Sequence, residues 1–154
     1  MPGGEESQKR RELTLCLVVS RFNRPVTESL EVGARDCLVA EGVDQQRIDT
    51  LHVPGAWELP FGVRLALERE RYDGILALGC VVRGETPHFE YVSMGATVGL
   101  EALARESGIP IGFGLLTTDD AEQAFARAGG AKGNKGEETA LAVLAMCDLA
   151  ARLR

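Results

Sequence analysis

Apolar residues gather along the chain in four short continuous runs rather than alternating with polar residues. The runs cover residues 13–19, 48–53, 75–82 and 109–116, and β-branched residues are common in them. A continuous apolar run of this length is typical of a strand that is buried on both faces, as in a parallel sheet. The pattern therefore predicts four buried parallel strands.

Segments of helical length separate and follow these runs. Pro25 and Gly42 are typical start and stop residues for the first of them. The alternation of strands and helices predicts an α/β fold, a three-layer sandwich in which a four-stranded parallel sheet has right-handed crossovers and helices on both faces. The expected helices cover residues 25–41, 58–71, 87–106, 121–128 and 135–152.

Length and composition indicate a single globular domain. The chain has 154 residues, of which 45% are hydrophobic and 26% are charged. We assign residues 13–154 to the domain and the polar residues 1–12, which lack the apolar core of a signal peptide, to a flexible N-terminal arm. A net charge of -6 argues against nucleic acid or an anionic membrane as a partner, because both need a basic surface. We also expect no membrane span, since no apolar stretch approaches the roughly 20 residues required.

The cysteines and histidines do not form a recognisable metal or disulfide pattern. Cys16 and Cys80 lie within apolar runs, where cysteine behaves as a small hydrophobic residue, and Cys37 and Cys147 lie far from both. We interpret them as free thiols in the reducing environment of the cytoplasm. His88 and the only other histidine in the chain have no zinc-ligand spacing, so no metal is expected.

The residues that could carry chemistry lie where the predicted strands end. Open parallel sheets bind ligands outside the carboxyl ends of their strands. Phe22, Trp57, Arg83, Glu85 and His88 all fall at these ends, so we predict a pocket there. The ends read S-R-F-N (20–23), P-G-A-W-E (54–58), R-G-E-T-P-H (83–88) and T-T-D-D (117–120).

The third strand end predicts an anion site with a proton carrier beside it. Thr86 is the expected N-cap of the next helix and Pro87 its first residue. The free N–H groups of residues 84–86 could then hold a phosphate or a carboxylate. His88, in the first helical turn, is a candidate for proton transfer. The alternative is that His88 only caps or packs against the helix.

Other residues near the strand ends have equally ordinary alternatives. Phe22 and Trp57 could sandwich a planar ring or could belong to the core. Glu58 is more typical of a helix start than of a ligand. The glycine-rich segment 127–138 lacks the phosphate-loop motif, so we predict a flexible turn between the last two helices. Within it, Arg127 and Lys135 are candidates to meet an anion across a subunit interface.

Taken together, these segments resemble the lumazine synthases, the family that catalyses the penultimate step of riboflavin biosynthesis. The likeness runs from about residue 13 to the C-terminus, and the R-G-E-T-x-H corner followed by G-N-K-G is its most specific part. It implies a flavodoxin-like, lumazine synthase-type version of the predicted sandwich. The matching segments are S-R-F-N (20–23), V-P-G-A-W-E-L-P (53–60), A-L-G-C-V-V-R-G-E-T-P-H-F-E-Y-V (77–92), L-L-T-T-D (115–119), R-A-G (127–129) and G-N-K-G (133–136).

The resemblance implies an enzyme, a transferase that needs no cofactor and no metal. It would condense 5-amino-6-(D-ribitylamino)uracil with 3,4-dihydroxy-2-butanone 4-phosphate, giving 6,7-dimethyl-8-ribityllumazine, phosphate and water. His88 would shuttle protons, and the phosphate substrate would be bound by Glu85, Thr86 and Arg127. The pyrimidine substrate would be bound by Phe22, Ala56, Trp57, Glu58, Cys80, Val81, Val82, Phe113 and Lys135, with the backbone of residues 80–82 on the uracil edge.

The resemblance also implies an assembly. The family forms homo-oligomers, pentamers that in some members close into icosahedral capsids, and a neighbouring subunit supplies Phe113, Arg127 and Lys135. Riboflavin synthase is a candidate partner. Trp57 stands where phenylalanine is frequent in the family, Glu138 replaces an aspartate of some relatives, and Gly130-Ala131-Lys132 differs from the usual threonine-lysine.

Competing functions remain open from the sequence. A flavodoxin-like module that only binds a flat ring would explain the aromatic residues, but not Arg127 and Lys135 at the family's spacing. A shell protein without activity would not need Phe22 and His88 together with Arg127. Riboflavin synthase activity is a weaker alternative, because that enzyme has a β-barrel fold.

Overall fold

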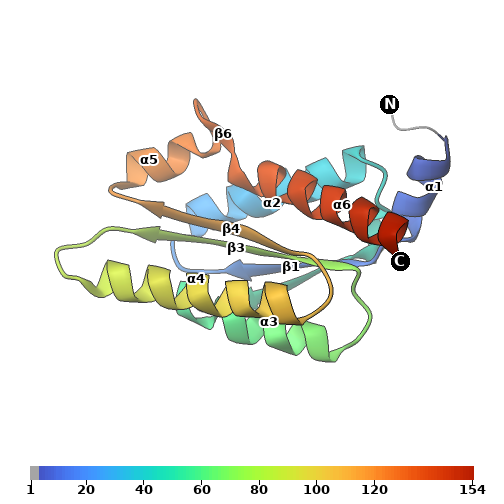
Figure 1. The fold of residues 1–154 in the computed structure, drawn as a ribbon. Helices are drawn as coiled ribbons and strands as arrows, with labels where there is room; N and C mark the ends of the chain where they lie inside the picture. Colours follow the sequence, from blue (N-terminus) through green and yellow to red (C-terminus); the bar gives the residue numbers. More distant parts are fainter. Residues whose placement is uncertain (1–3) are drawn as a thin grey trace.

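The predicted strands form one parallel sheet at the centre of the protein (Figure 1). The structure is a computed structural model and describes residues 4–154. The sheet has the strand order β2-β1-β3-β4, so β2 and β4 are its two edges. The strands are β1 (Leu15–Ser20), β2 (Ile48–Val53), β3 (Gly74–Val82) and β4 (Ile111–Thr118).

Two long helices cover each face of the sheet (Figure 1). Helices α2 (Arg24–Ala40) and α6 (Lys135–Leu153) pack on one face, and α3 (Leu59–Glu68) and α4 (His88–Glu106) pack on the other. A short helix, α5 (Ala121–Ala126), follows β4 at the carboxyl edge of the sheet. The predicted fold class, a three-layer α/β sandwich, is confirmed.

Strand β1 shows why the apolar runs are continuous. The side chains of Leu17 and Val19 join the apolar cluster under α2 and α6, whereas Cys16 and Val18 join the cluster under α3 and α4. Every residue of β1 is buried, because each of its faces is covered by helices. Successive side chains point to opposite faces of the sheet, and both faces are apolar, so the strand has an unbroken apolar sequence.

Helices α2 and α6 come into close backbone contact at Gly136. A Cβ atom at this position would collide with the carbonyl oxygen of Leu30. Gly136→Ala is therefore expected to lower the free energy of unfolding by about 1–3 kcal/mol, since the helices must move apart to accept the methyl group. Urea denaturation at one protein concentration measures this change. The exposed variant Glu138→Gln on the same helix is the control, and equal stability of the two variants would contradict the packing described.

The N-terminal segment forms a helix where the sequence predicted a flexible arm. Helix α1 (Gly4–Glu12) is polar along its length, so it has no apolar face from which a helix could be predicted. Its Arg10 contacts Glu41 of the loop after α2 at 2.6 Å and Asp148 of α6 at 2.9 Å. The flexibility of the arm stays a prediction, and residues 1–3 lie outside the described residues.

The glycine-rich segment after α5 is a small hairpin rather than a plain turn. Strands β5 (Ala128–Gly130) and β6 (Gly133–Asn134) pair in antiparallel fashion. Gly129 and Gly133 have φ angles of 104° and 86°, which glycine adopts without strain. The Asn134 side chain then accepts from the Gly136 N–H at 2.8 Å and caps α6.

The four cysteines are free thiols, as predicted. Cys16, Cys80 and Cys147 are buried, and burial raises the pKa of the Cys16 and Cys80 thiols to about 11 and that of Cys147 to about 12. Cys37 is only half-buried. At pH 8 we expect a thiol reagent to modify at most Cys37 in the native protein, because the others are protonated and covered, and all four thiols after denaturation. Rapid modification of all four in the native state would contradict this burial.

Candidate active site

A pocket of about 660 Å³ lies where the sequence predicted it, outside the carboxyl ends of β1, β2 and β3. Aromatic, aliphatic and polar residues line it, a combination that suits a flat ligand with polar edges. Seven of the nine predicted pyrimidine-binding residues line it, together with Thr86 and His88. The lining residues are Phe22, Gly55, Ala56, Trp57, Glu58, Cys80, Val81, Val82, Gly84, Thr86, His88, Phe89, Tyr91 and Val92.

The loop after β1 displays Phe22 to the pocket. The N–H groups of Arg21 and Phe22 donate to the carbonyl groups of Val53 and Pro54 at 2.8 and 3.0 Å, which continues the pairing with the end of β2. Asn23 has a left-handed φ of 61° and donates from Nδ2 to the Cys80 carbonyl at 2.9 Å. Phe22 is held at its backbone while 71% of its surface stays exposed, so it does not belong to the core of this chain.

Trp57 forms a second aromatic wall. It lies in a short 3-10 helix, Ala56–Glu58, and is 61% exposed. Its ring lies against Gly95 of α4, where a Cβ atom would collide with it. The Glu58 carboxylate accepts from the Gly55 N–H at 3.1 Å. Glu58 thus supports the turn and still reaches the pocket.

Strand β3 brings backbone groups to the pocket because it extends beyond the end of its pairing with β1. Its pairing with β1 ends at Leu78, whereas its pairing with β4 continues to Val82. Alternate residues of a strand direct their N–H and C=O groups to opposite sides. Cys80 and Val82 therefore point theirs toward the β1 side and the pocket, and Val81 points its own toward β4.

The corner after β3 holds several free N–H groups. Within the described chain, the N–H groups of Gly84, Glu85, Thr86, His88 and Phe89 have no hydrogen-bond acceptor in the loop or helix. They precede and open α4, whose positive end favours an anion. This arrangement supports the anion site predicted from the sequence.

The helix start differs from the prediction by one residue. Pro87 is the N-cap of α4, and its carbonyl accepts from the Glu90 and Tyr91 N–H groups at 3.0 and 3.4 Å. Thr86 makes no capping bond, so its assignment as N-cap was wrong. The shift leaves the Thr86 hydroxyl free in the pocket lining.

His88 is the first residue of α4 and is exposed in the pocket. Tyr91 and Val92 line the pocket with it, one helical turn further on. Tyr91, Val92 and Phe89 were not predicted as site residues from the sequence. The spacing along the sequence could have identified Tyr91 and Val92, since positions three and four residues after His88 lie on the same face of the helix.

Four predicted site residues lie outside this pocket. Glu85 is exposed and is not part of the lining. Phe113, on edge strand β4, is 45% exposed. Arg127 donates to the Gln123 carbonyl at 3.0 Å, and Lys135 begins α6. The last three therefore belong to surfaces that this chain does not turn toward its own pocket.

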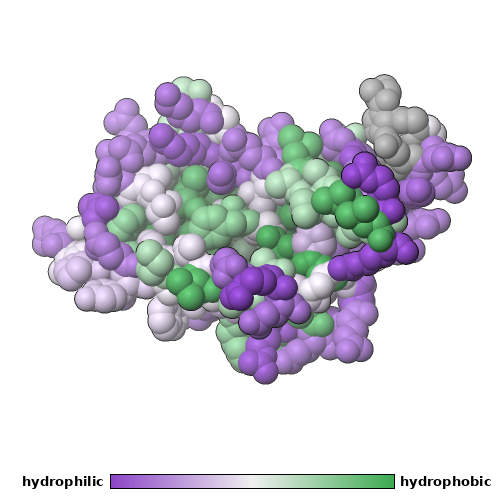
Figure 2. All heavy atoms as spheres, in the orientation of Figure 1, coloured by the Kyte–Doolittle hydropathy of each residue, from purple (hydrophilic) through white to green (hydrophobic). Residues whose placement is uncertain are grey.

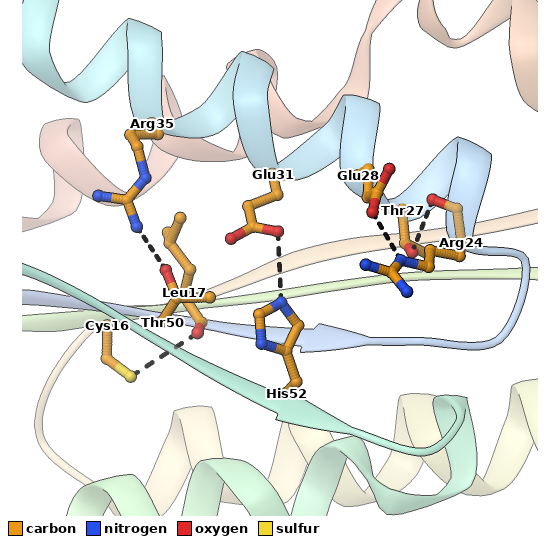
Figure 3. Close-up of polar contacts among 9 residues, drawn as sticks. All are labelled: Cys16, Leu17, Arg24, Thr27, Glu28, Glu31, Arg35, Thr50 and His52. Carbon is orange, nitrogen blue, oxygen red and sulfur yellow. Dashed lines mark hydrogen bonds and ion pairs between the residues drawn. The ribbon is translucent and has the colours of Figure 1, made fainter.

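A second hollow, of about 270 Å³, lies between α2 and the edge strand β2. Four of its polar side chains are paired with one another (Figure 3): Arg24 contacts Glu28 at 2.6 Å, and His52 contacts Glu31 at 3.4 Å. No aromatic ring besides His52 lines it. We therefore place the ligand site in the larger pocket.

Two further findings concern the described residues 4–154. None of their helices is both long and apolar enough to cross a membrane. They also contain no group of three or more histidine, cysteine or acidic side chains placed to hold a metal ion.

The fold and the pocket define an α/β protein of the flavodoxin-like class, with aromatic residues and a helix start at the carboxyl ends of its strands. Comparison with known proteins specifies it further. The family model described as 6,7-dimethyl-8-ribityllumazine synthase matches residues 12–151. The chain belongs to the 6,7-dimethyl-8-ribityllumazine synthase family.

Three relatives carry that same name. The chain is 53% identical to the protein of Gemmatimonas aurantiaca over 135 residues, which covers 88% of this chain and 82% of the relative. It is 45% identical to that of Nautilia profundicola, covering 88% of each chain. It is 46% identical to that of Helicobacter pylori, covering 86% of this chain and 87% of the relative. The family is one of transferases that act in riboflavin biosynthesis, as the sequence motifs implied.

Proposed function

We propose that this pocket condenses 5-amino-6-(D-ribitylamino)uracil with 3,4-dihydroxy-2-butanone 4-phosphate. The observation that carries the proposal is the meeting of three features in one pocket: exposed aromatic walls, free N–H groups at a helix start, and His88 in the same lining. The product is 6,7-dimethyl-8-ribityllumazine, with release of phosphate and water. The names of the family and of the three relatives state this product.

The pyrimidine lies between Phe22 and Trp57 in this proposal. Their exposed rings offer a flat apolar surface. The backbone groups of Cys80 and Val82 meet the polar edge of the uracil ring. One Cys80 acceptor position is already taken by Asn23, so the Cys80 carbonyl keeps one lone pair for the ligand. Glu58 and Ala56 are left to contact the ribityl chain.

The phosphate lies on the N–H groups of residues 84–86. None of these N–H groups has an acceptor among residues 4–154, so binding does not break a hydrogen bond that the structure describes. Glu85 contributes only its backbone, which agrees with its side chain standing outside the pocket. Arg127 of a neighbouring subunit adds a charged partner, since an arginine fork matches a phosphate.

His88 moves protons in the steps that follow. The 5-amino group of the pyrimidine attacks the ketone carbon, and loss of water gives an imine. A proton leaves the substrate carbon as the phosphate leaves with its bonding electrons. The remaining amine then closes the ring, and a second water is lost. The residues of this chain hold the reactants together and carry protons, which can supply roughly 7–11 kcal/mol through proximity alone.

The active protein is a homo-oligomer, a pentamer that can build a larger shell. Figure 2 shows apolar side chains gathered in a band across β4 between α4 and α6. The large apolar side chains exposed on these three elements include Phe113 of β4, Met94 and Val98 of α4, and Leu141 and Met146 of α6. An apolar band of this kind supports a protein contact. In the assembly, Phe113 and Lys135 of one subunit complete the pyrimidine site of the next, and the protein works in the cytoplasm, where its free thiols stay reduced.

Turnover tests the proposal directly. The purified protein is mixed with both substrates, and lumazine is followed by its absorbance and fluorescence while phosphate is measured separately. We expect one phosphate for each lumazine formed. Binding of the pyrimidine without any turnover would favour the ring-binding module instead. No lumazine from the assembled protein would identify it as a shell protein without activity.

A further inference from the structure

The side chain of Arg83, the first residue after β3, is held by three partners. Its Nε donates to the Asp119 carboxylate, at the end of β4, at 3.0 Å. Its Nη1 pairs with the Glu90 carboxylate in the first turn of α4. The guanidinium also lies over the ring of Phe89, 4.5 Å from the ring centroid. One side chain thus joins the end of a strand to the start of the helix that carries His88.

The backbone of Arg83 is fixed as well. Its N–H donates to the Thr118 carbonyl at 2.8 Å, which extends the pairing of β3 and β4 by one residue. The backbone N–H of Arg83 is therefore not free for a ligand, unlike those of Gly84, Glu85 and Thr86. Arg83 is the last residue paired with β4, and the loop 84–87 with its free N–H groups follows it.

The loop from Gly84 to Pro87 has little structure of its own to hold it. None of its side chains makes a hydrogen bond within the described chain. A Cβ at Gly84 would meet no atom within 4 Å, so no neighbouring side chain packs against this residue. Its shape depends on its two ends, and the Arg83–Glu90 contact joins them directly.

We propose that Arg83 is a positioning residue that fixes the phosphate-binding loop 84–87 and the first turn of α4 relative to the end of β4. It acts through Glu90, Asp119 and Phe89 and does not touch the substrate. The proposal rests on the condensation proposed above. Its consequence is specific to the phosphate substrate, because Phe22 and Trp57 are held by other contacts.

Direct binding of phosphate by Arg83 is disfavoured by its charge environment. One guanidinium faces two carboxylates, so the group of Arg83, Glu90 and Asp119 has a net charge of 1 − 2 = −1. The Arg83 hydrogen bond also holds the pKa of the Glu90 carboxyl below its usual value, so that carboxylate stays charged at neutral pH. A phosphate approaching this group would meet more negative charge than positive charge.

Steady-state kinetics of Arg83→Gln test the proposal in the assembled protein. We expect the KM for 3,4-dihydroxy-2-butanone 4-phosphate to rise about tenfold or more, since a small displacement of binding groups is costly. The KM for the pyrimidine should stay within about twofold. Arg83→Lys should recover little, because one ammonium cannot bridge two carboxylates and stack on a ring. Arg105→Gln, which breaks an exposed ion pair with Glu101 far along α4, is the matched control.

The carboxylate variants separate positioning from direct binding. Asp119→Asn and Glu90→Gln should raise the KM for the phosphate substrate in the same direction as Arg83→Gln. A fall in that KM would overturn the proposal, because it would mean that a released guanidinium binds the phosphate itself. Full rescue by Arg83→Lys, or unchanged KM values for Arg83→Gln in an active enzyme, would also overturn it. An inactive wild-type protein would instead overturn the proposed condensation.

Discussion

His88→Ala is expected to lower kcat by about 10²- to 10⁴-fold, the usual contribution of a positioned proton carrier. Turnover should not vanish, because the pocket still holds both reactants together and proximity supplies roughly 7–11 kcal/mol on its own. KM for either substrate should change little, since His88 is exposed in the pocket and no hydrogen bond of the described chain depends on its side chain. Steady-state kinetics with each substrate varied in turn measure both parameters.

The other histidine supplies the control for this experiment. His52 lies in the hollow between α2 and β2, paired with Glu31 and outside the pocket (Figure 3). His52→Ala should leave kcat within about twofold of the wild type, as expected for a surface change away from the site. An unchanged kcat for His88→Ala would remove His88 from the mechanism.

Arg127→Ala is expected to raise the KM for the phosphate substrate by roughly 10- to 100-fold. This range corresponds to the loss of a charged hydrogen bond of about 1.5–3 kcal/mol. The KM for the pyrimidine should change little, because its proposed contacts are the aromatic walls and the β3 backbone. Steady-state kinetics measure the KM for each substrate. Isothermal titration with inorganic phosphate measures the loss of phosphate affinity independently. Equal weakening of both substrates would contradict the assignment of Arg127 to phosphate.

The positions of the strands and their burial on both faces could be predicted from the sequence. A strand covered on both faces has a continuous run of apolar residues. The predicted run 48–53 is the observed β2, and 75–82 differs from β3 by one residue. Helix α1 could not be predicted this way, because its residues are polar all round and its docking depends on Arg10 meeting distant acidic groups. The hairpin after α5 depends on two left-handed glycines, whose φ angles a sequence does not reveal.

The place of the pocket was predictable for a similar reason. A parallel sheet brings its strand ends to one edge, so Phe22, Trp57 and His88 had to meet there. What could not be predicted depends on register and side-chain direction. The Asn23 bond to Cys80 arises because β3 outruns β1, and the Arg83 contacts arise because β4 ends beside α4. The one-residue shift at Thr86 shows the same limit, since threonine is a preferred N-cap and proline a preferred first helical residue, yet Pro87 is the N-cap here.

We propose that each site condenses its substrates with His88 from one subunit and Arg127 from another. To test for a shared site, denatured His88→Ala and Arg127→Ala subunits are mixed in equal amounts and refolded together. Random assembly pairs an intact His88 with a neighbour's intact Arg127 at roughly a quarter of the sites. We expect about a quarter of wild-type activity at low phosphate-substrate concentration, well above the activity of either variant alone. Activity equal to the mean of the two separate variants would contradict a shared site.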